Sequence, residues 1–133
     1  MKTLLKLEES AQFLLCVALL VVMGSPWWVF LLLLIGPDIG MLGYLVGTRT
    51  GAFTYNLFHH KAVALIVVFA GLFDLSGANL WSDTATGNIG LLQAGLVLYG
   101  HAAMDRIFGF GLKHGDSFQH THLGWIAGQR PLS

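Results

Sequence analysis

Charged side chains are scarce in this sequence, and their scarcity excludes most soluble folds. Asp, Glu, Lys and Arg make up 11 % of the 133 residues, whereas a soluble domain carries about 25 %. Seven basic residues balance seven acidic ones, so the chain lacks the positive charge with which proteins bind nucleic acid. Its single cysteine, Cys16, cannot build a disulfide framework. Hydrophobic residues make up 55 % instead, which predicts an integral membrane protein with the lipid bilayer as its partner.

Four apolar segments are long enough to span a bilayer as helices. They run over roughly residues 4–23, 27–46, 51–73 and 90–111. Each is close to the ~20 residues that ~30 Å of hydrocarbon requires. Because the connections are short, consecutive helices should pack antiparallel. The sequence therefore predicts an all-α fold, an integral membrane four-helix antiparallel bundle. It would form a single transmembrane domain over residues 1–133, with residues 112–133 as a cytoplasmic tail.

The first segment also has features of a signal peptide, because Lys2 and Lys6 precede its apolar run. Glu8 and Glu9 interrupt the basic region, however, and no small-residue cleavage site follows. We therefore interpret this segment as a membrane span.

The basic residues indicate the orientation of the bundle. Four antiparallel spans place all of them on or near one side: Lys2, Lys6, Arg49, Lys61, Arg106, Lys113 and Arg130. The opposite connections carry Asp74 and Asp83 as their only charged residues. By the positive-inside rule, both termini should face the cytoplasm. Aromatic residues should mark the two interfaces: Trp27, Trp28 and Trp81 the outer one, Tyr44 and Tyr55 the inner one.

Acidic and imidazole side chains within the apolar segments fall at similar depths. Counted from the cytoplasmic ends, Asp38 and His59 each lie ~12 Å inside their segments. His101 and Asp105 lie ~15 Å and ~9 Å inside the fourth segment, and Glu8 lies ~6 Å inside the first. All four predicted helices thus contribute to one polar layer. Such groups are costly in hydrocarbon, so their clustering indicates a functional site.

The spacing of these residues suits metal ligation. His101 and Asp105 are four residues apart, so both lie on one face of a helix. Asp38 follows Pro37, whose ring removes a backbone hydrogen bond and frees a carbonyl group. Carboxylates and neutral imidazoles without thiolates suit zinc, iron or manganese. We therefore expect a divalent metal, zinc or iron, as cofactor.

The candidate site residues fall into three groups. The candidate metal ligands are Glu8, Asp38, His59, His101, Asp105 and His122, the last carried to the site by a glycine-rich tail. The candidate catalytic residues are Glu8, Asp38, Asn56, His59, His101 and Asp105. Arg106 and Lys113, expected at the cytoplasmic surface, could bind an anionic headgroup.

Several stretches carry a resemblance to a known family. They are residues 37–45, 55–59, 101–106, 109–113 and 118–124, together with Leu7 and Glu8. Over nearly its whole length the chain resembles the small bacterial membrane proteins grouped as the domain-of-unknown-function 4260 family. The family's pattern falls on Glu8, Asp38, Asn56, His59, His101, Asp105, Arg106, Lys113 and His122. It departs at His114 and His120, which are therefore not counted as ligands. The resemblance implies the bacterial inner (cytoplasmic) membrane but no activity.

These residues predict a membrane-embedded, metal-dependent protein, an enzyme of hydrolase or oxidoreductase type. It would act on a lipidic or apolar substrate at the cytoplasmic side. One alternative is a proton or cation transporter subunit that uses the same polar layer. A haem protein would use His59 and His101 as axial ligands, which leaves the acids unexplained. A structural subunit, in which the polar layer only sets helix register, is a further alternative, and homo-oligomers are compatible with all of these.

Overall fold

The computed structural model describes residues 2–73 and 88–126, which form five α-helices, one 3-10 helix (η1) and a short β-hairpin. The elements are α1 (Lys2–Val22), α2 (Trp27–Ile35), η1 (Gly36–Leu45), α3 (Thr48–His59), α4 (Lys61–Phe73), α5 (Ile89–Phe108), β1 (His120–Thr121) and β2 (Gly124–Trp125). The fold is all-α, as predicted, because β1 and β2 have two residues each. Some residues used in the sequence analysis lie outside the described ones: Asp74, Trp81, Asp83 and Arg130.

Two of the predicted helices are broken rather than continuous. Segment 27–46 consists of α2 followed by η1, and the change of winding begins at Gly36, just before Pro37. Proline lacks the amide hydrogen that continues an α-helix, which explains this break. Segment 51–73 divides at His60, whose backbone is extended (φ −87°, ψ 114°). The helix axis therefore bends by 45° between α3 and α4.

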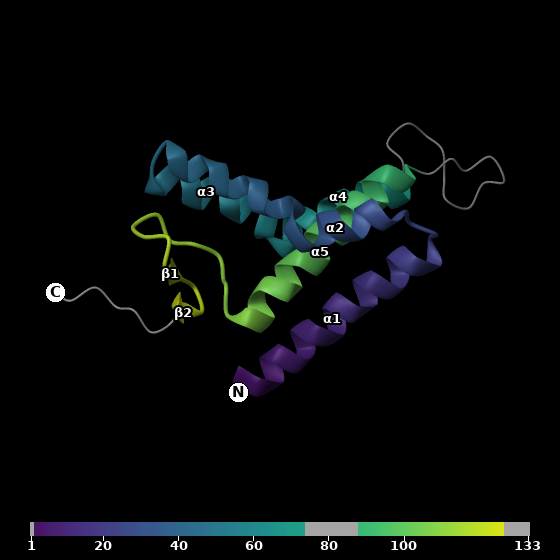
Figure 1. Ribbon diagram of the computed structural model, residues 1–133, viewed down its shortest axis with the longest axis horizontal. Helices are drawn as coiled ribbons and strands as arrows, with labels where there is room; N and C mark the ends of the chain where they lie inside the picture. Colours follow the sequence, from purple (N-terminus) through teal and green to yellow (C-terminus); the bar gives the residue numbers. More distant parts are fainter. Residues whose placement is uncertain (1, 74–87, 127–133) are drawn as a thin grey trace.

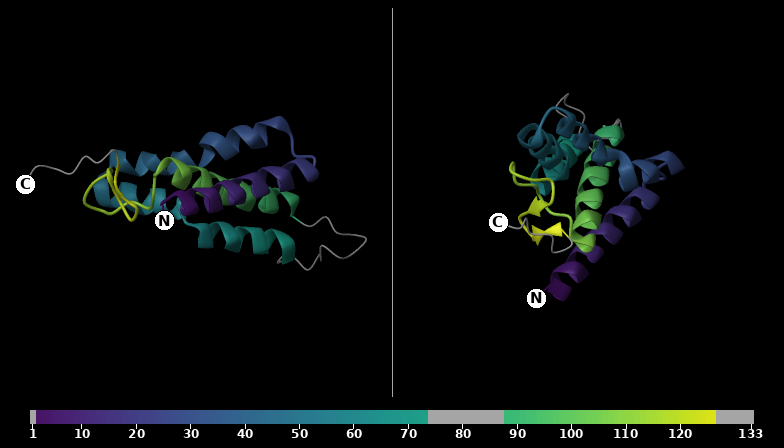
Figure 2. Two further views of the ribbon diagram at one scale, coloured as in Figure 1. Left: turned by 90° about the horizontal axis from the view of Figure 1, so that it is seen from below. Right: turned by 60° about the vertical axis from the view of Figure 1, so that its left-hand side comes forward.

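Helix α5 is the centre of the fold (Figure 1). It packs against α1, α2 and α4, while η1 lies along α3. The main apolar core forms between α1, α2 and α5 and contains Cys16, Leu20, Val29, Leu33, Leu96 and Val97. Figure 2 shows the β-hairpin beside the end of α5, near the N-terminus of the chain.

Glycines bring neighbouring backbones together in two places. A Cβ atom on Gly95 would lie 2.5 Å from a side-chain carbon of Val68, so α5 and α4 can pack this closely only around glycine. A Cβ atom on Gly43 would lie 2.1 Å from Thr54 Oγ1, at the contact of η1 with α3. Gly43 therefore lies where η1 packs closely against α3.

The described helices give one membrane-length apolar helix, or two. Residues Trp27–Leu45, formed by α2 and η1, are long and apolar enough to cross a bilayer. The bent pair α3 and α4 passes the same test if the two are counted as one span.

Candidate metal centre

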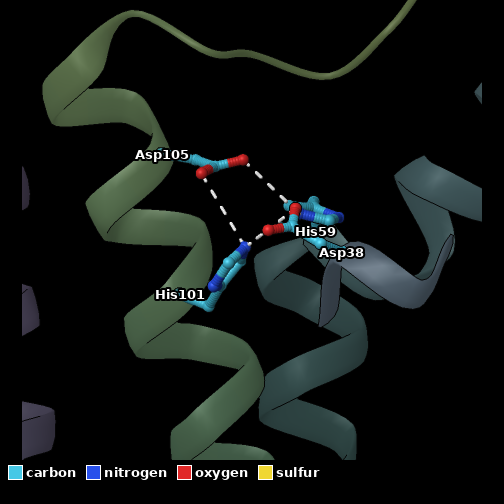
Figure 3. Close-up of side chains that lie close together, drawn as sticks. All are labelled: Asp38, His59, His101 and Asp105. Atoms are coloured by element: carbon cyan, nitrogen blue, oxygen red, sulfur yellow. Dashed lines mark ion pairs between the residues drawn. The ribbon is translucent and has the colours of Figure 1, made fainter. Parts of the chain in front are cut away.

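Four side chains from three elements converge on one point (Figure 3). Asp38 comes from the start of η1, His59 from the end of α3, and His101 and Asp105 from successive turns of α5. One ligand atom from each residue lies within 4.8 Å of those of the other three. Both helix breaks lie beside this group, because Asp38 follows Pro37 and His59 precedes His60. We call these residues the four-residue cluster.

Within the cluster, each imidazole Nε2 lies close to a carboxylate oxygen of both aspartates. His59 Nε2 lies 3.6 Å from Asp38 Oδ1 and 3.4 Å from Asp105 Oδ2. His101 Nε2 lies 3.4 Å from Asp38 Oδ1 and 3.7 Å from Asp105 Oδ1. Four ligands held ~2.1 Å from one tetrahedral ion would lie ~3.4 Å from each other. The four nitrogen–oxygen distances are therefore close to the spacing around a single small cation, although the ligand atoms as a set lie up to 4.8 Å apart.

The backbone determines which nitrogen of each imidazole carries the proton. His59 Nδ1 lies 2.8 Å from the Tyr55 carbonyl oxygen, and His101 Nδ1 lies 2.9 Å from that of Leu33. Because a carbonyl oxygen only accepts, each Nδ1 must donate, and the Nε2 of a neutral ring then presents a lone pair. Both Nε2 atoms are buried and, among the described residues, have no hydrogen-bond partner. Hydrogen bonds of this kind orient histidines that bind metal.

Two lone pairs that face two carboxylates repel one another unless a positive charge lies between them. The residues His59 and His101 are 3 % and 0 % exposed, so water screens this repulsion poorly. Asp38, whose side chain is 42 % exposed, connects the cluster with the surroundings. The arrangement is thus suited to hold a cation that could enter past Asp38.

Tyr55 is a neighbour of the cluster that was not among the predicted site residues. It was expected to mark the inner membrane interface, and the structure shows that it is buried within the protein, at 3 % exposed. Its hydroxyl donates to Asp105 Oδ2 at 2.5 Å, and its ring stacks on His59 with centroids 3.7 Å apart. Tyr55 and His59 are four residues apart on one helix face, and this spacing was the signal that could have identified it.

Asn56 and Lys113 hold the C-terminal segment against α3. The Asn56 side chain accepts from Lys113 N at 2.7 Å and donates to Lys113 O at 2.9 Å. The Lys113 side chain is buried, with Nζ 4.0 Å from the Phe118 ring centroid and 5.1 Å from that of Tyr55. Burial lowers the pKa of Lys113. The structure thus places Lys113 beneath aromatic rings rather than at the surface, where a headgroup ligand was expected.

The remaining predicted residues lie outside the four-residue cluster. Glu8 is exposed and accepts from Gln12 Nε2 at 3.4 Å. Its neighbour Glu9 is the acid that turns toward the bundle, where it pairs with Lys61 and lies 3.8 Å from Arg106. His122 Nδ1 accepts from Leu112 N at 2.8 Å, in the tail. Arg106 follows Asp105 in α5 but faces α1 through Glu9.

Comparison with characterised proteins and with solved structures gives no match. Comparison with family models gives one match, to the family described as "Domain of unknown function (DUF4260)", and it covers residues 2–126. The match includes all four residues of the cluster and every other candidate ligand. The chain therefore belongs to the DUF4260 family, as the sequence resemblance indicated.

Proposed function

We propose that this chain is a membrane protein that binds one divalent metal ion, zinc or iron, at Asp38, His59, His101 and Asp105. We further propose that it is an enzyme, a hydrolase or an oxidoreductase, acting on a lipid-like substrate at the cytoplasmic side. The observation that carries the proposal is the pair of buried Nε2 atoms that face two carboxylates without a hydrogen donor among the described residues.

Charge balance favours a divalent ion. Two carboxylates and two neutral imidazoles carry a net charge of −2, which is costly where three of the four side chains are at most 15 % exposed. A divalent cation neutralises this charge, and nitrogen and carboxylate ligands without thiolate suit zinc, iron or manganese. A bound ion with an open coordination position would supply Lewis-acid activation of water or, as iron, activation of oxygen.

The surface of α1 and α2 supports a membrane location. Only 22 % of the span Trp27–Leu45 is buried inside the protein, whereas the apolar core helix of a soluble protein would be mostly covered. Large apolar side chains are also exposed along α1, among them Leu14, Leu15 and Val22. Exposed apolar surface of this extent requires lipid or another protein to cover it. We propose that the lipid bilayer covers it, with four spans and both termini in the cytoplasm.

An apolar groove suggests the class of substrate. It has a volume of about 370 Å³ and lies between α2 and α5, with Trp28, Leu32 and Leu98 in its walls. Pro37 and Phe58, the chain neighbours of two cluster residues, also line it. An acyl chain bound in this groove would therefore end beside the cluster. Apolar clefts with few polar groups are typical of small-molecule sites, and the apolar lining of this one suits a lipid-like molecule.

The alternatives fit the cluster less well. A porphyrin cannot lie between His59 and His101, whose rings contact edge to face with centroids 4.9 Å apart. A structural role would satisfy the two Nε2 atoms within the fold. Cation transport is favoured by one observation, the two helix breaks at the cluster, because transporters bind ions at broken helices. Transport would require an ion that exchanges rapidly, whereas the enzyme requires a resident one.

Metal analysis of the detergent-purified protein tests the proposal. We expect close to one zinc or iron per chain in the wild type, and loss of the metal in His59→Ala and His101→Ala. His60→Ala is the matched control, because His60 is adjacent in sequence but exposed and should retain the ion. Chelation should abolish hydrolysis of a medium-chain ester, and zinc should restore it. A wild-type protein that remains free of metal after incubation with zinc and iron(II) would contradict the proposal.

A further inference from the structure

Figure 2 shows the β-hairpin and the N-terminal end of α1 at the same end of the molecule. A second cavity is lined by residues of both. It has a volume of about 590 Å³ and lies between the start of α1, the end of α5 and the hairpin. The polar side chains in its walls are Lys2, Lys6, Glu9, Arg106 and His122. We call this cavity the basic pocket. None of its residues belongs to the four-residue cluster, so it needs a separate explanation.

The basic pocket has a surplus of positive charge. Lys2, Lys6 and Arg106 face a single acid, Glu9, which is already paired with Lys61. The Arg106 side chain is 17 % exposed, and its Nη1 lies 3.8 Å from Glu9 Oε1. That distance is too long for a hydrogen bond, so among the described residues the guanidinium donors remain available to a ligand. A partly buried guanidinium recognises phosphate well, because its planar fork donates two parallel hydrogen bonds.

His122 adds a neutral donor to the same pocket. Its Nδ1 accepts from Leu112 N at 2.8 Å, so the ring proton is on Nε2. Burial, and then the positive charge of Arg106, lower the pKa of His122, which keeps the ring neutral at pH 7. A Cβ atom on Gly111 would lie 2.7 Å from His122 Nδ1. The ring therefore occupies a position that only glycine at 111 allows, with one N–H group left to donate.

The other walls of the basic pocket are apolar. They are formed by Leu5, Phe108, Leu123, Trp125 and Ile126. A cavity that is cationic in one part and apolar in another matches an amphiphile with an anionic head. If the chain spans the membrane as proposed, this end faces the cytoplasmic leaflet, where anionic headgroups are found.

We propose that the basic pocket binds a phosphate group, carried by an anionic lipid or by a free phosphate compound. Arg106 and the two lysines supply the charge, and His122 Nε2–H supplies a neutral hydrogen bond. This binding does not depend on the metal, so it can hold or fail independently of the proposed function.

Trp125 lies in the wall of the pocket, so its fluorescence can report the binding of a ligand. A variant carrying Trp27→Phe, Trp28→Phe and Trp81→Phe leaves Trp125 as its only tryptophan. In non-ionic detergent it is titrated with dioctanoyl phosphatidic acid, dioctanoyl phosphatidylcholine and inorganic phosphate. We expect saturable fluorescence changes with phosphatidic acid, and about tenfold weaker binding of phosphatidylcholine, whose choline repels the lysines. Inorganic phosphate that binds as tightly as phosphatidic acid would identify free phosphate as the source, and weaker binding would identify the lipid.

Substitutions within this single-tryptophan background complete the test. Arg106→Gln should weaken phosphatidic acid binding about tenfold or more, and Lys6→Gln, at an exposed position that tolerates change, about threefold. Arg49→Gln removes an exposed charge that does not line the pocket and should bind like the parent. Metal content should be unchanged in all three. Equal binding of both lipids, no saturable signal with any probe, or equal losses in Arg106→Gln and Arg49→Gln would overturn the proposal.

Discussion

Replacement of Tyr55 by phenylalanine should weaken metal binding without removing any ligand. The change deletes one oxygen, which donates to Asp105 Oδ2 at 2.5 Å. The aromatic ring that stacks on His59, with centroids 3.7 Å apart, is retained. Tyr55→Phe therefore tests whether the hydroxyl orients Asp105 toward the ion.

Two independent estimates give the same magnitude for this effect. A hydrogen bond to a charged group contributes about 1.5–3 kcal/mol. Loss of an outer-shell partner of a metal ligand costs about 10–100-fold in affinity, which corresponds to about 1.4–2.8 kcal/mol. We therefore expect the dissociation constant for zinc to rise about tenfold or more in Tyr55→Phe.

Competition of the purified protein with a chromophoric chelator measures this change. Tyr44→Phe is the matched control, because the Tyr44 hydroxyl is buried and, within residues 2–73 and 88–126, has no hydrogen-bond partner. The control should bind zinc like the wild type. Wild-type affinity in Tyr55→Phe would refute the assignment of Asp105 as an oriented ligand. Equal losses in both tyrosine variants would indicate a general effect of packing.

Three further predictions concern packing, the tail and pH. Gly43→Ala should lower the free energy of unfolding by about 1–3 kcal/mol, because the new Cβ would lie 2.1 Å from Thr54 Oγ1. Gly47→Ala is the control, because a Cβ there has free space among the described residues. This control should have the melting temperature of the wild type in detergent. Asn56→Ala loses both bonds to the Lys113 backbone, so amide exchange in residues 112–126 should accelerate, and unchanged exchange would contradict this role. The lowered pKa of Lys113 means that the unfolded chain holds more protons just below pH 10.5. Thermal stability should thus rise with pH between the lowered pKa and 10.5, and Lys113→Met should abolish that rise.

The sequence was sufficient to predict that the four cluster residues lie at a similar depth. A depth count along each segment placed Asp38, His59, His101 and Asp105 in one layer, and the structure joins them within 4.8 Å. Depth can be predicted from residue number because a helix rises by a constant amount per residue. Composition and segment length likewise predicted helices whose ends agree with the observed ones within a few residues, as for α1 and α5.

The face of the helix on which a side chain lies was harder to predict than its depth along the helix. Glu8 and Glu9 lie at nearly the same depth but point about 100° apart, and Glu9 is the one that turns inward. Tyr55 has a polar tip and so resembled an interface residue, yet its hydroxyl finds a buried partner in Asp105. The tail that carries His122 has no helical period, so its course depends on contacts far apart in the sequence.

The break at His60 had no local signal, since neither proline nor glycine is near it. Its position beside His59 indicates a tertiary cause. Backbone groups freed at such breaks must find partners within the protein when lipid surrounds it. The hydroxyl of Thr54, in α3, donates to the Gly40 carbonyl of η1 at 2.6 Å, so one broken segment supplies a partner to the other.

The two breaks and the four-residue cluster are therefore best understood together. An ion in the cluster would link η1, α3 and α5, and two of these three elements begin or end at a break. Broken helices are retained in membranes mainly where they line a polar site or a cavity. A fold that needed only an apolar scaffold would keep the helices continuous and avoid buried carboxylates. Within residues 2–73 and 88–126, the breaks, the imidazole nitrogens without hydrogen-bond partners and the acids thus coincide at the place where the proposed ion would bind.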